Sequence, residues 1–375
     1  MSRKRKIVFL TGTRADFGKL KSLIGVIEQS DLFEAYIFVT GMHTLSKYGS
    51  TFHEVEKQKY KNIFVYMNQA ETTEMDIILS NTVVGFSNFV KEIKPDLIIV
   101  HGDRVESLAG AIVGSFNNIL VAHVEGGELS GTVDELIRHS ITKLSHVHFV
   151  SNKKAEKRLM QMGENKNSIF IIGSPDIDIM KAENLPEIEN VKQYYDIFFK
   201  DYALFIYHPV TTEIKNLKNN INEVVTALID SKKDYIVIYP NNDSGSDIIL
   251  DEYKRIQKNN HFKIYPSLKF EYFLALLKHS KFIIGNSSAG IGEAEVYGIP
   301  SINIGSRQNN RTKNENIINV KNDKNEIIKA INLVGGMKIK PMSCFGDGDS
   351  AEKFYDVVTN QKVWKTNIQK QFLDL

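Results

Sequence analysis

Three carboxylate side chains follow short β-branched runs in the first half of the chain. Asp103 comes after residues 97–101, Glu125 comes after residues 120–124, and Asp134 lies in the next loop. One aspartate at a strand end is more often a helix cap. Parallel strands end at the same edge of a sheet, however, so these three side chains are expected to converge. Carboxyl groups in opposite protonation states act as general acid and general base, and the sequence leaves that assignment open.

A glycine-containing turn follows the first apolar run. Residues 11–19 read TGTRADFGK and place Arg14 and Lys19 at the beginning of a predicted helix. Helix amides and basic side chains bind phosphate groups, so the turn is a candidate diphosphate site; the alternative is an ordinary turn with solvated charges. Arg104, beside Asp103, adds a further guanidinium. The dinucleotide fingerprint G-x-G-x-x-G is absent here, and no nicotinamide cofactor is expected.

The second half carries polar residues at similar positions. Residues 285–293 read GNSSAGIGE, and small residues with hydroxyl groups at a helix start form a phosphate cradle. Three residues into that predicted helix, a glutamate could accept hydrogen bonds from ribose hydroxyls. The candidate binding residues of this half are His208, Ser287, Ser288, Glu293 and Arg307.

The elements that would position these side chains alternate between short strands and amphipathic helices. This order is typical of a parallel sheet covered by helices. The predicted strands of the first half are residues 7–11, 36–40, 63–66, 97–101, 120–124, 147–150 and 169–172. Those of the second half are residues 204–207, 236–239, 262–265, 282–284, 302–304 and 317–320.

Length and linker composition predict two Rossmann-like domains facing across a cleft. A chain of 375 residues exceeds the usual size of a single core. The acidic, proline-containing segment 181–190 is a predicted linker. The expected domains are therefore residues 1–180 and 181–350. Residues 351–375 are expected to form two helices that pack back on the first domain through Phe354, Val357, Val358, Trp364 and Phe372.

Composition excludes several classes of protein. Hydrophobic residues make up 42% and charged residues 25%, and the net charge of +2 is spread along the chain, so neither disorder nor nucleic-acid binding is expected. The apolar run at residues 7–10 is too short for a signal peptide, and no segment is long enough to span a membrane. A cytoplasmic protein is expected. Cys344 is the single cysteine, which excludes an internal disulfide and makes a cysteine zinc site implausible.

Together these motifs resemble the hydrolysing UDP-N-acetylglucosamine 2-epimerases, above all the sialic-acid-pathway branch that releases N-acetylmannosamine. The resemblance covers nearly the whole chain and is carried by TGTRADFGKL (11–20), HGDR (101–104), HVEGGELSGTVDELIRHS (123–140), HPVTTE (208–213), YPNNDSGS (239–246) and GNSSAGI with Glu293 (285–293). The branch that only interconverts UDP sugars usually has Pro-Glu-Glu where this chain has Val133-Asp134-Glu135. This departure favours the hydrolysing reaction.

The resemblance implies a glycosyltransferase-B fold, a homo-oligomer, and no metal or cofactor. It assigns Asp103, Glu125 and Asp134 to catalysis, with His208 also functional. The nucleotide UDP would be held by Arg14, Lys19, Arg104, Asn241, Ser287, Ser288, Glu293 and Arg307. UDP-N-acetylglucosamine would react with water through 2-acetamidoglucal. The alternatives are an epimerase for a UDP- or GDP-linked 2,4-diacetamido-2,4,6-trideoxyhexose of legionaminic acid synthesis, a glycosyltransferase, and a non-catalytic sensor.

Overall fold

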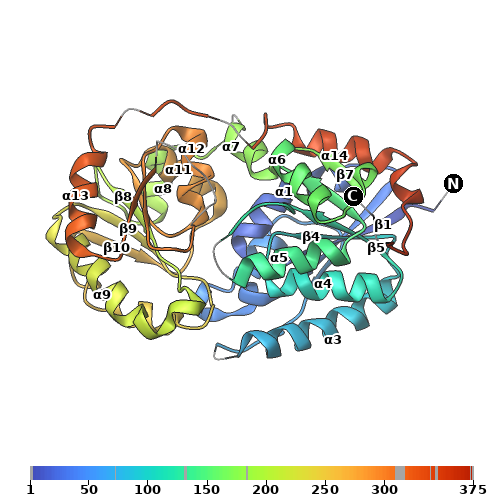
Figure 1. Cartoon of the computed structure of the whole chain (residues 1–375), viewed down its shortest axis with the longest axis horizontal. Helices are drawn as coiled ribbons and strands as arrows, with labels where there is room; N and C mark the ends of the chain where they lie inside the picture. The colour runs from blue at the N-terminus through green and yellow to red at the C-terminus, as the bar shows by residue number, and fades with distance from the viewer. Residues whose placement is uncertain are drawn as a thin grey trace. The chain divides into compact units, whose positions relative to one another are not determined.

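The chain divides into two compact units, which we describe separately. The computed structural model describes residues 3–71, 73–130, 133–182, 185–308, 317–337, 339–342, 345–371 and 373 (Figure 1). The first unit comprises Met1–Glu128, Asp134–Ala182 and Cys344–Leu375. The second comprises Leu129–Val133 and Glu183–Ser343. Cys344 itself lies outside the described residues.

A parallel sheet forms the centre of the first unit. Its strand order is β3-β2-β1-β4-β5-β6-β7. The strands are β1 (Arg5–Thr11), β2 (Phe33–Val39), β3 (Ile63–Val65), β4 (Leu97–His101), β5 (Leu120–Val124), β6 (Val147–Val150) and β7 (Ile169–Ile171). Each lies on one of the β-branched runs, so the strand predictions for this half are confirmed. Both faces of such a sheet are covered, which explains why β4 and β5 are buried at every residue.

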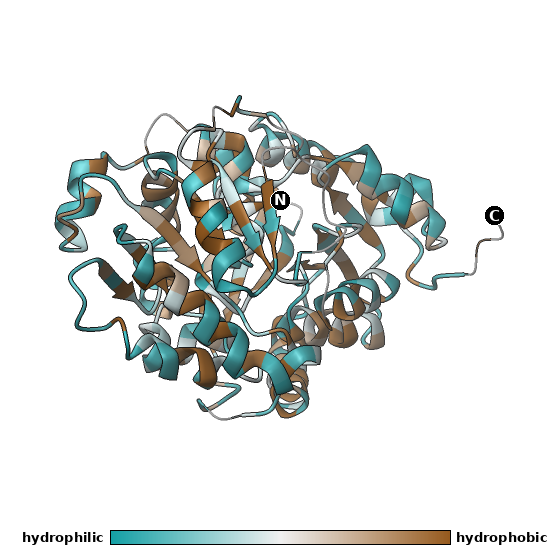
Figure 2. Cartoon of the chain, turned by 60° about the vertical axis from the view of Figure 1, so that its left-hand side comes forward, coloured by the Kyte–Doolittle hydropathy of each residue, from teal (hydrophilic) through white to brown (hydrophobic). Residues whose placement is uncertain are grey.

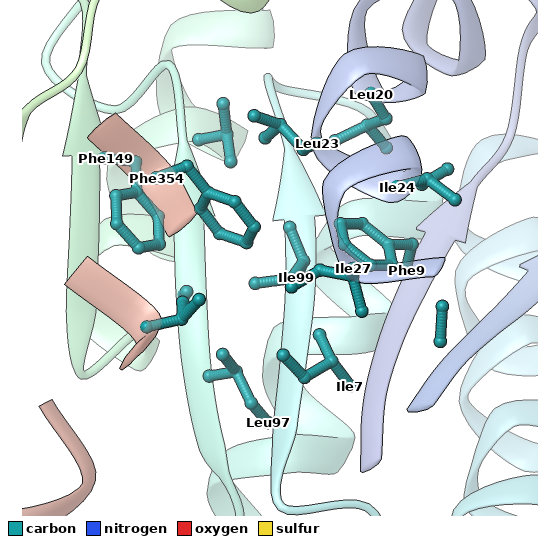
Figure 3. Packing of buried hydrophobic residues seen from close by; sticks show 14 of the residues in the cluster. Ile7, Phe9, Leu20, Leu23, Ile24, Ile27, Leu97, Ile99, Phe149 and Phe354 are labelled. Carbon is teal, nitrogen blue, oxygen red and sulfur yellow. The ribbon is translucent and has the colours of Figure 1, made fainter. Parts of the chain in front are cut away.

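Amphipathic helices cover this sheet. They are α1 (Arg14–Glu28), α2 (Phe52–Glu56), α3 (Met75–Ile93), α4 (Val105–Phe116), α5 (Val133–Leu144), α6 (Lys153–Gln161) and α7 (Pro175–Lys181). Helix α1 begins with a capping box in which Thr13 and Asp16 satisfy each other's backbone amides. Leu20, Leu23 and Ile27 follow at helical spacing and pack on the strands (Figure 3). Figure 2 shows that the hydrophobic and hydrophilic residues of the helices occupy different sides.

The C-terminal segment belongs to the core of the first unit, as predicted. Phe354 of α14 (Ser350–Thr359) lies 5.0 Å from Phe149 and 6.4 Å from Phe9 between ring centroids (Figure 3). Trp364 stacks on Phe33 at 6.0 Å. The second predicted helix is a single 3₁₀ turn, Val363–Lys365, because Asn360 adopts an extended conformation that ends α14. Phe372 lies outside the described residues.

The second unit repeats the architecture with strand order β10-β9-β8-β11-β12-β13. All strands are parallel. The strands are β8 (Ala203–Ile206), β9 (Tyr235–Ile238), β10 (Phe262–Tyr265), β11 (Ile283–Gly285), β12 (Ser301–Ile304) and β13 (Ile317–Val320). They confirm the strand predictions for this half.

Helices also cover the sheet of the second unit, and the first of them begins earlier than expected. They are α8 (Ile188–Tyr194), α9 (Ile214–Asp230), α10 (Ser246–Tyr253), α11 (Phe270–Lys278), α12 (Glu293–Tyr297) and α13 (Lys324–Val334). The end of the predicted linker, residues 188–190, is the first turn of α8, because Val191 of the same helix is fully buried. Among the residues that the structure covers, no helix has the length and apolar character that crossing a membrane requires.

Each sheet reverses its strand order beside its first strand. In the first unit β1 lies between β2 and β4, and in the second unit β8 lies between β9 and β11. Ligands of such sheets bind beyond the carboxyl ends of the strands at this reversal. The loops after β1, β4 and β5, and those after β8 and β11, are therefore where the site residues are expected.

Candidate active site

Arg138 connects two of the three predicted catalytic carboxylates. Its guanidinium donates one hydrogen bond to Oδ2 of Asp103 and another, at 2.6 Å, to the backbone oxygen of Glu125. Arg138 is 2% exposed. Burial opposes its charge, but Asp103 and then Glu125 raise the pKa of Arg138 above its usual value. The loops after β4 and β5 are thus joined by one side chain of α5.

Basic side chains lie beside the carboxylate of Glu125. Its Oε1 accepts hydrogen bonds from Lys19 at 3.2 Å and from Ser174 at 2.9 Å, and its Oε2 lies 3.4 Å from Nε2 of His101. Burial alone would raise the pKa of Glu125, but Lys19, His101 and Arg138 together hold that pKa well below its usual value. The side chain is therefore a stable carboxylate in the unliganded protein.

The backbone of Glu125 has a left-handed conformation, with φ of 63°. Such a conformation costs a residue with a β-carbon about 1 kcal/mol or more, and it persists only where the surroundings enforce it. The Glu125 amide donates to the oxygen of Phe149 at 3.0 Å, and Gly127 follows with φ of 77°. The turn directs the carboxylate toward Lys19. Strain of this kind is typical of functional positions.

Asp134 lies one helical turn before Arg138 in the first turn of α5. Residues four apart share one face of a helix, which places the third carboxylate on the same side as Arg138. Asp134 also contributes to the raised pKa of Arg138, after Asp103, Glu125 and Glu128. All three predicted carboxylates therefore act electrostatically on one guanidinium.

His123 fixes the loop that carries Asp103. Its Nε2 lies 2.8 Å from the oxygen of Gly102, which can only accept, so Nε2 carries the hydrogen. Its Nδ1 then accepts from the hydroxyl of Thr142 at 3.1 Å. Burial lowers the pKa of His123 to about 3, so the ring is neutral. Gly102 has φ of 71°, a conformation suited to glycine, and the neutral ring holds this turn in place.

The turn after β1 places its two predicted phosphate ligands in ion pairs. Arg14 donates through Nε to Oε2 of Glu54 at 2.7 Å and forms a second bond to the other carboxylate oxygen. Lys19 pairs with Glu125 and lies 3.7 Å from Oδ2 of Asp176. Asp16 is buried and accepts from the amides of residues 12 and 13. Phosphate binding by Arg14 or Lys19 remains a prediction, in which a phosphate oxygen would compete with these carboxylates.

In the second unit, His208 and Asn286 are joined across the strand reversal. The amide of His208 donates to Oδ1 of Asn286 at 2.6 Å, and Nδ2 of Asn286 donates to the oxygen of His208 at 2.8 Å. The amide of Asn241 donates to Nδ1 of His208 at 3.0 Å. In the neutral ring, Nε2 therefore carries the hydrogen. Backbone contacts thus set both the orientation and the tautomer of His208.

Asn286 also forms hydrogen bonds with the loop after β12. Its backbone oxygen accepts from Arg307 at 3.3 Å and from Gln308 at 2.9 Å. The preceding residue must be glycine, because a β-carbon on Gly285 would lie 1.9 Å from the oxygen of Ile206. The backbone of β11 can therefore approach β8 closely. This approach brings Asn286 within hydrogen-bonding distance of His208.

The predicted phosphate cradle differs from expectation in its helix. Ser288–Gly290 forms a 3₁₀ turn, capped by Ser287, and α12 begins only at Glu293. Glu293 is therefore the first residue of its helix, whereas the sequence predicts it three residues inside the helix. Gly292, with ψ of −76°, separates the two elements. Glu293 is buried at 6% exposure.

The sequence predicts the carboxylates of the site but not the side chains that contact them. Arg138, His101 and Asn286 were not among the candidate residues. Arg138 could have been found from its spacing to Asp134, because the two residues are four positions apart and so share one face of a helix. Asn286 stands inside the motif at 285–293 but gave no signal of its pairing. Within the described ranges, no group of three or more histidine, cysteine, aspartate or glutamate residues could hold a metal ion.

The two parallel-sheet units define an α/β protein with the glycosyltransferase-B fold. The family model described as UDP-N-acetylglucosamine 2-epimerase matches residues 26–359. The chain belongs to this epimerase family.

Relatives with known names agree with this assignment. A UDP-N-acetylglucosamine 2-epimerase of Neisseria meningitidis serogroup B is 46% identical over 375 residues, covering 99% of each chain. A hydrolysing UDP-N,N'-diacetylbacillosamine 2-epimerase of Legionella pneumophila is 35% identical, covering 94% of this chain and 95% of the relative. The UDP-N-acetylglucosamine 2-epimerase of Methanocaldococcus jannaschii, solved with UDP-N-acetylglucosamine and UDP, shares the fold with a TM-score of 0.79 and 23% identity, covering 94% and 99%.

Proposed function

We propose that the protein is a hydrolysing UDP-N-acetylglucosamine 2-epimerase, which converts UDP-N-acetylglucosamine and water to UDP and N-acetylmannosamine. The observation that carries the proposal is the set of three carboxylates, Asp103, Glu125 and Asp134, arranged around Arg138. A reaction that removes one proton from sugar C2 and returns another needs at least two such groups. The 46% identity to the Neisseria enzyme supports the same substrate.

Departure of UDP must come first in this reaction. The hydrogen on C2 is not acidic while C1 remains bonded to UDP, so no carboxylate could remove it before the C1–O bond weakens. Arg14, Arg104 and His208 are proposed to stabilise the departing diphosphate, which is commonly the largest catalytic contribution. Loss of UDP and of the C2 proton gives 2-acetamidoglucal. Water then adds at C1, and a proton returns to C2 from the opposite face.

The ionisation state of Glu125 indicates which catalytic role it has. Lys19, His101 and Arg138 hold it as a carboxylate, and a carboxylate of low pKa is a weak base but a strong stabiliser of positive charge. We propose that Glu125 stabilises the oxocarbenium-like centre at C1. Asp103 and Asp134 would then exchange the C2 protons.

The residues of the second unit are proposed to hold the nucleotide. His208 has a fixed ring, and Asn286 ties its backbone to the loop that carries Arg307. A rigid arrangement of donors binds phosphate with little loss of entropy on binding. Ser287 and Ser288 would contact phosphate, while the buried carboxylate of Glu293 would accept from ribose hydroxyls. Asn241 would complete this set.

A second substrate is supported by one specific comparison. The Legionella relative, named as a hydrolysing 2-epimerase of UDP-N,N'-diacetylbacillosamine, matches 94% of this chain at 35% identity. The same catalytic carboxylates would serve that 2,4-diacetamido-2,4,6-trideoxy sugar. The higher identity to the Neisseria protein supports UDP-N-acetylglucosamine as the first candidate.

The test is a proton NMR time course in deuterated buffer with UDP-N-acetylglucosamine. We expect UDP and free N-acetylmannosamine that carries deuterium at C2. Formation of UDP-N-acetylmannosamine without free sugar would contradict hydrolysis. An inert substrate together with turnover of UDP-N,N'-diacetylbacillosamine would favour the second candidate.

Two variants of the aspartates that flank β4 serve as the internal comparison. Asp103→Asn alters the carboxyl end of the strand, and we expect it to reduce turnover by roughly 10²- to 10⁴-fold. Asp96→Asn alters the opposite end, where Oδ2 of Asp96 accepts from the amide of Lys6 at 2.8 Å. We expect that variant to keep its turnover.

A further inference from the structure

A buried glutamate lies beneath the turns that follow β1 and β2. Glu106, in the first turn of α4, is 0% exposed, and within the described part of the chain neither carboxyl oxygen has a hydrogen-bond partner. A β-carbon on Gly12 would lie 3.0 Å from Cδ of Glu106, and one on Gly41 would lie 2.6 Å from its Oε1. The two glycines therefore leave room for this carboxyl group beside the predicted phosphate-binding turn.

Two charged groups face Glu106. Nε of Arg104, at the start of the same helix, lies 3.5 Å from Oε2 of Glu106, and Asp16 of α1 is the nearby negative charge. Burial has the largest effect and raises the pKa of Glu106 above its usual value, Arg104 opposes this shift, and Asp16 adds to it. Arg104 is thus the opposing charge that favours the ionised form. Glu106 is therefore more easily protonated when another group neutralises the charge of Arg104.

Arg104 is also a predicted ligand of the nucleotide diphosphate. We propose that Glu106 is a positioning residue, which holds Arg104 in the free protein and takes up one proton from solvent when Arg104 pairs with the diphosphate. This inference rests on the proposed function, because it requires a nucleotide diphosphate at Arg104. The proton adds to the Glu106 carboxylate, and no other bond forms or breaks.

The affinity for UDP should depend on pH in a defined direction. A diphosphate neutralises the charge of Arg104, so the pKa of Glu106 is higher in the complex than in the free protein. Between these two values, binding consumes protons, and affinity for UDP falls as the pH rises. The slope reaches at most about tenfold per pH unit, because a single proton is involved. A glutamine at this position has the same size and cannot titrate.

Isothermal titration calorimetry with UDP measures the proton count directly. At each pH between 6 and 9, titrations in two phosphate-free buffers that differ in ionisation enthalpy give the number of protons taken up. We expect the wild type to take up more protons than Glu106→Gln within this range, and Glu106→Asp to retain uptake in a shifted range. Protons exchanged by UDP itself are common to all variants and cancel in the difference.

Controls separate the possible failures. Glu164→Gln removes another buried carboxylate of the first unit, one that pairs with Lys143 and His148, and should keep the wild-type proton count. Equal counts in wild type and Glu106→Gln would overturn the role of Glu106 while leaving UDP binding intact. Absence of UDP binding by the wild type would instead overturn the proposed nucleotide site. If Glu106→Gln does not fold, the wild type is compared with Glu106→Asp. The same proton count at every pH in both proteins would overturn the inference.

Discussion

Arg138 and Asp103 form an ion pair between α5 and the loop after β4, in which the guanidinium is buried and the carboxylate is partly exposed, although 35 positions separate them in the chain. The same guanidinium donates to the backbone oxygen of Glu125 at 2.6 Å. One side chain therefore sets the spacing of two predicted catalytic carboxylates. Its charge also helps to hold Glu125 in the ionised form.

Replacing this guanidinium should cost both stability and turnover. Removing one partner of a fully buried ion pair costs about 3–5 kcal/mol, and we expect a smaller loss here because the carboxylate of Asp103 is partly exposed to water. We expect Arg138→Met to lower the melting temperature clearly and to abolish turnover. Arg138→Lys should recover much of the stability but little of the turnover, because an ammonium cannot donate in two fixed directions. Differential scanning calorimetry and the NMR assay measure the two effects.

A comparison with another arginine tests whether the effect is specific. Arg158 donates to the oxygen of Gly127 at 3.0 Å, beside the same loop. We expect Arg158→Lys to retain turnover. Equal loss of turnover in the lysine variants of Arg138 and Arg158 would argue against a special role for Arg138.

Neutralising the carboxylates should separate chemistry from nucleotide binding. We expect Asp103→Asn, Glu125→Gln and Asp134→Asn each to reduce kcat by roughly 10²- to 10⁴-fold. Affinity for UDP should remain near the wild-type value, because these groups act on the sugar. Steady-state kinetics and calorimetry with UDP provide the two readouts. Full turnover in any of these variants would exclude that carboxylate from the reaction.

The hydrogen bonds between Asn286 and His208 should support nucleotide binding. Asn286→Ala removes two side-chain hydrogen bonds to the His208 backbone, for a loss of about 1–3 kcal/mol in unfolding free energy. It also loosens the backbone of His208, although the bond from the Asn241 amide to the ring remains. We expect weaker UDP binding, with KM raised more than kcat is lowered.

An aspartate at the same position distinguishes the two bonds. Asn286→Asp keeps an acceptor for the His208 amide but places a carboxylate oxygen against the His208 carbonyl. We therefore expect Asn286→Asp to be no better than Asn286→Ala in UDP affinity. Wild-type affinity in both variants, measured by calorimetry, would show that the pairing does not support the nucleotide site.

Two buried histidines should make the protein sensitive to acid. Burial lowers the pKa of His43 to about 4 and that of His123 to about 3, while an exposed histidine titrates near 6.5. Between these values the unfolded chain binds more protons than the folded protein. Stability is therefore full above about pH 6.5 and falls as the pH decreases toward 4. Each histidine contributes a loss of about 1.4 kcal/mol per pH unit.

Chemical denaturation at several pH values tests this dependence. His43 contacts the hydroxyls of Thr11 and Thr51, so His43→Gln keeps a polar group that cannot titrate. We expect the slope of unfolding free energy against pH between 6.5 and 4 to decrease by one proton in His43→Gln. An unchanged slope would mean that His43 is charged in the folded protein.

The strands were predictable because both faces of a parallel sheet are buried. Each β-branched run, such as residues 97–101 and 120–124, became a strand. The chemistry at their ends was also visible, since Asp103 and Glu125 directly follow buried strands. Helix ends were less predictable: Glu293 begins α12 because Gly292 interrupts the preceding turn. Such a break depends on backbone angles that residue types only partly specify.

The sequence by itself determined the class of protein: a parallel α/β chain in two parts, with carboxylates and phosphate-binding residue types at strand ends. These properties depend on residue type and local spacing. Only the tertiary structure decided the pairings, because strand order brings β1, β4 and β5 side by side. Lys19 thereby meets Glu125, 106 positions away, and Arg104 lies beside the buried Glu106. Partners and burial set the charge of a carboxyl group, and both arise only when distant segments pack together.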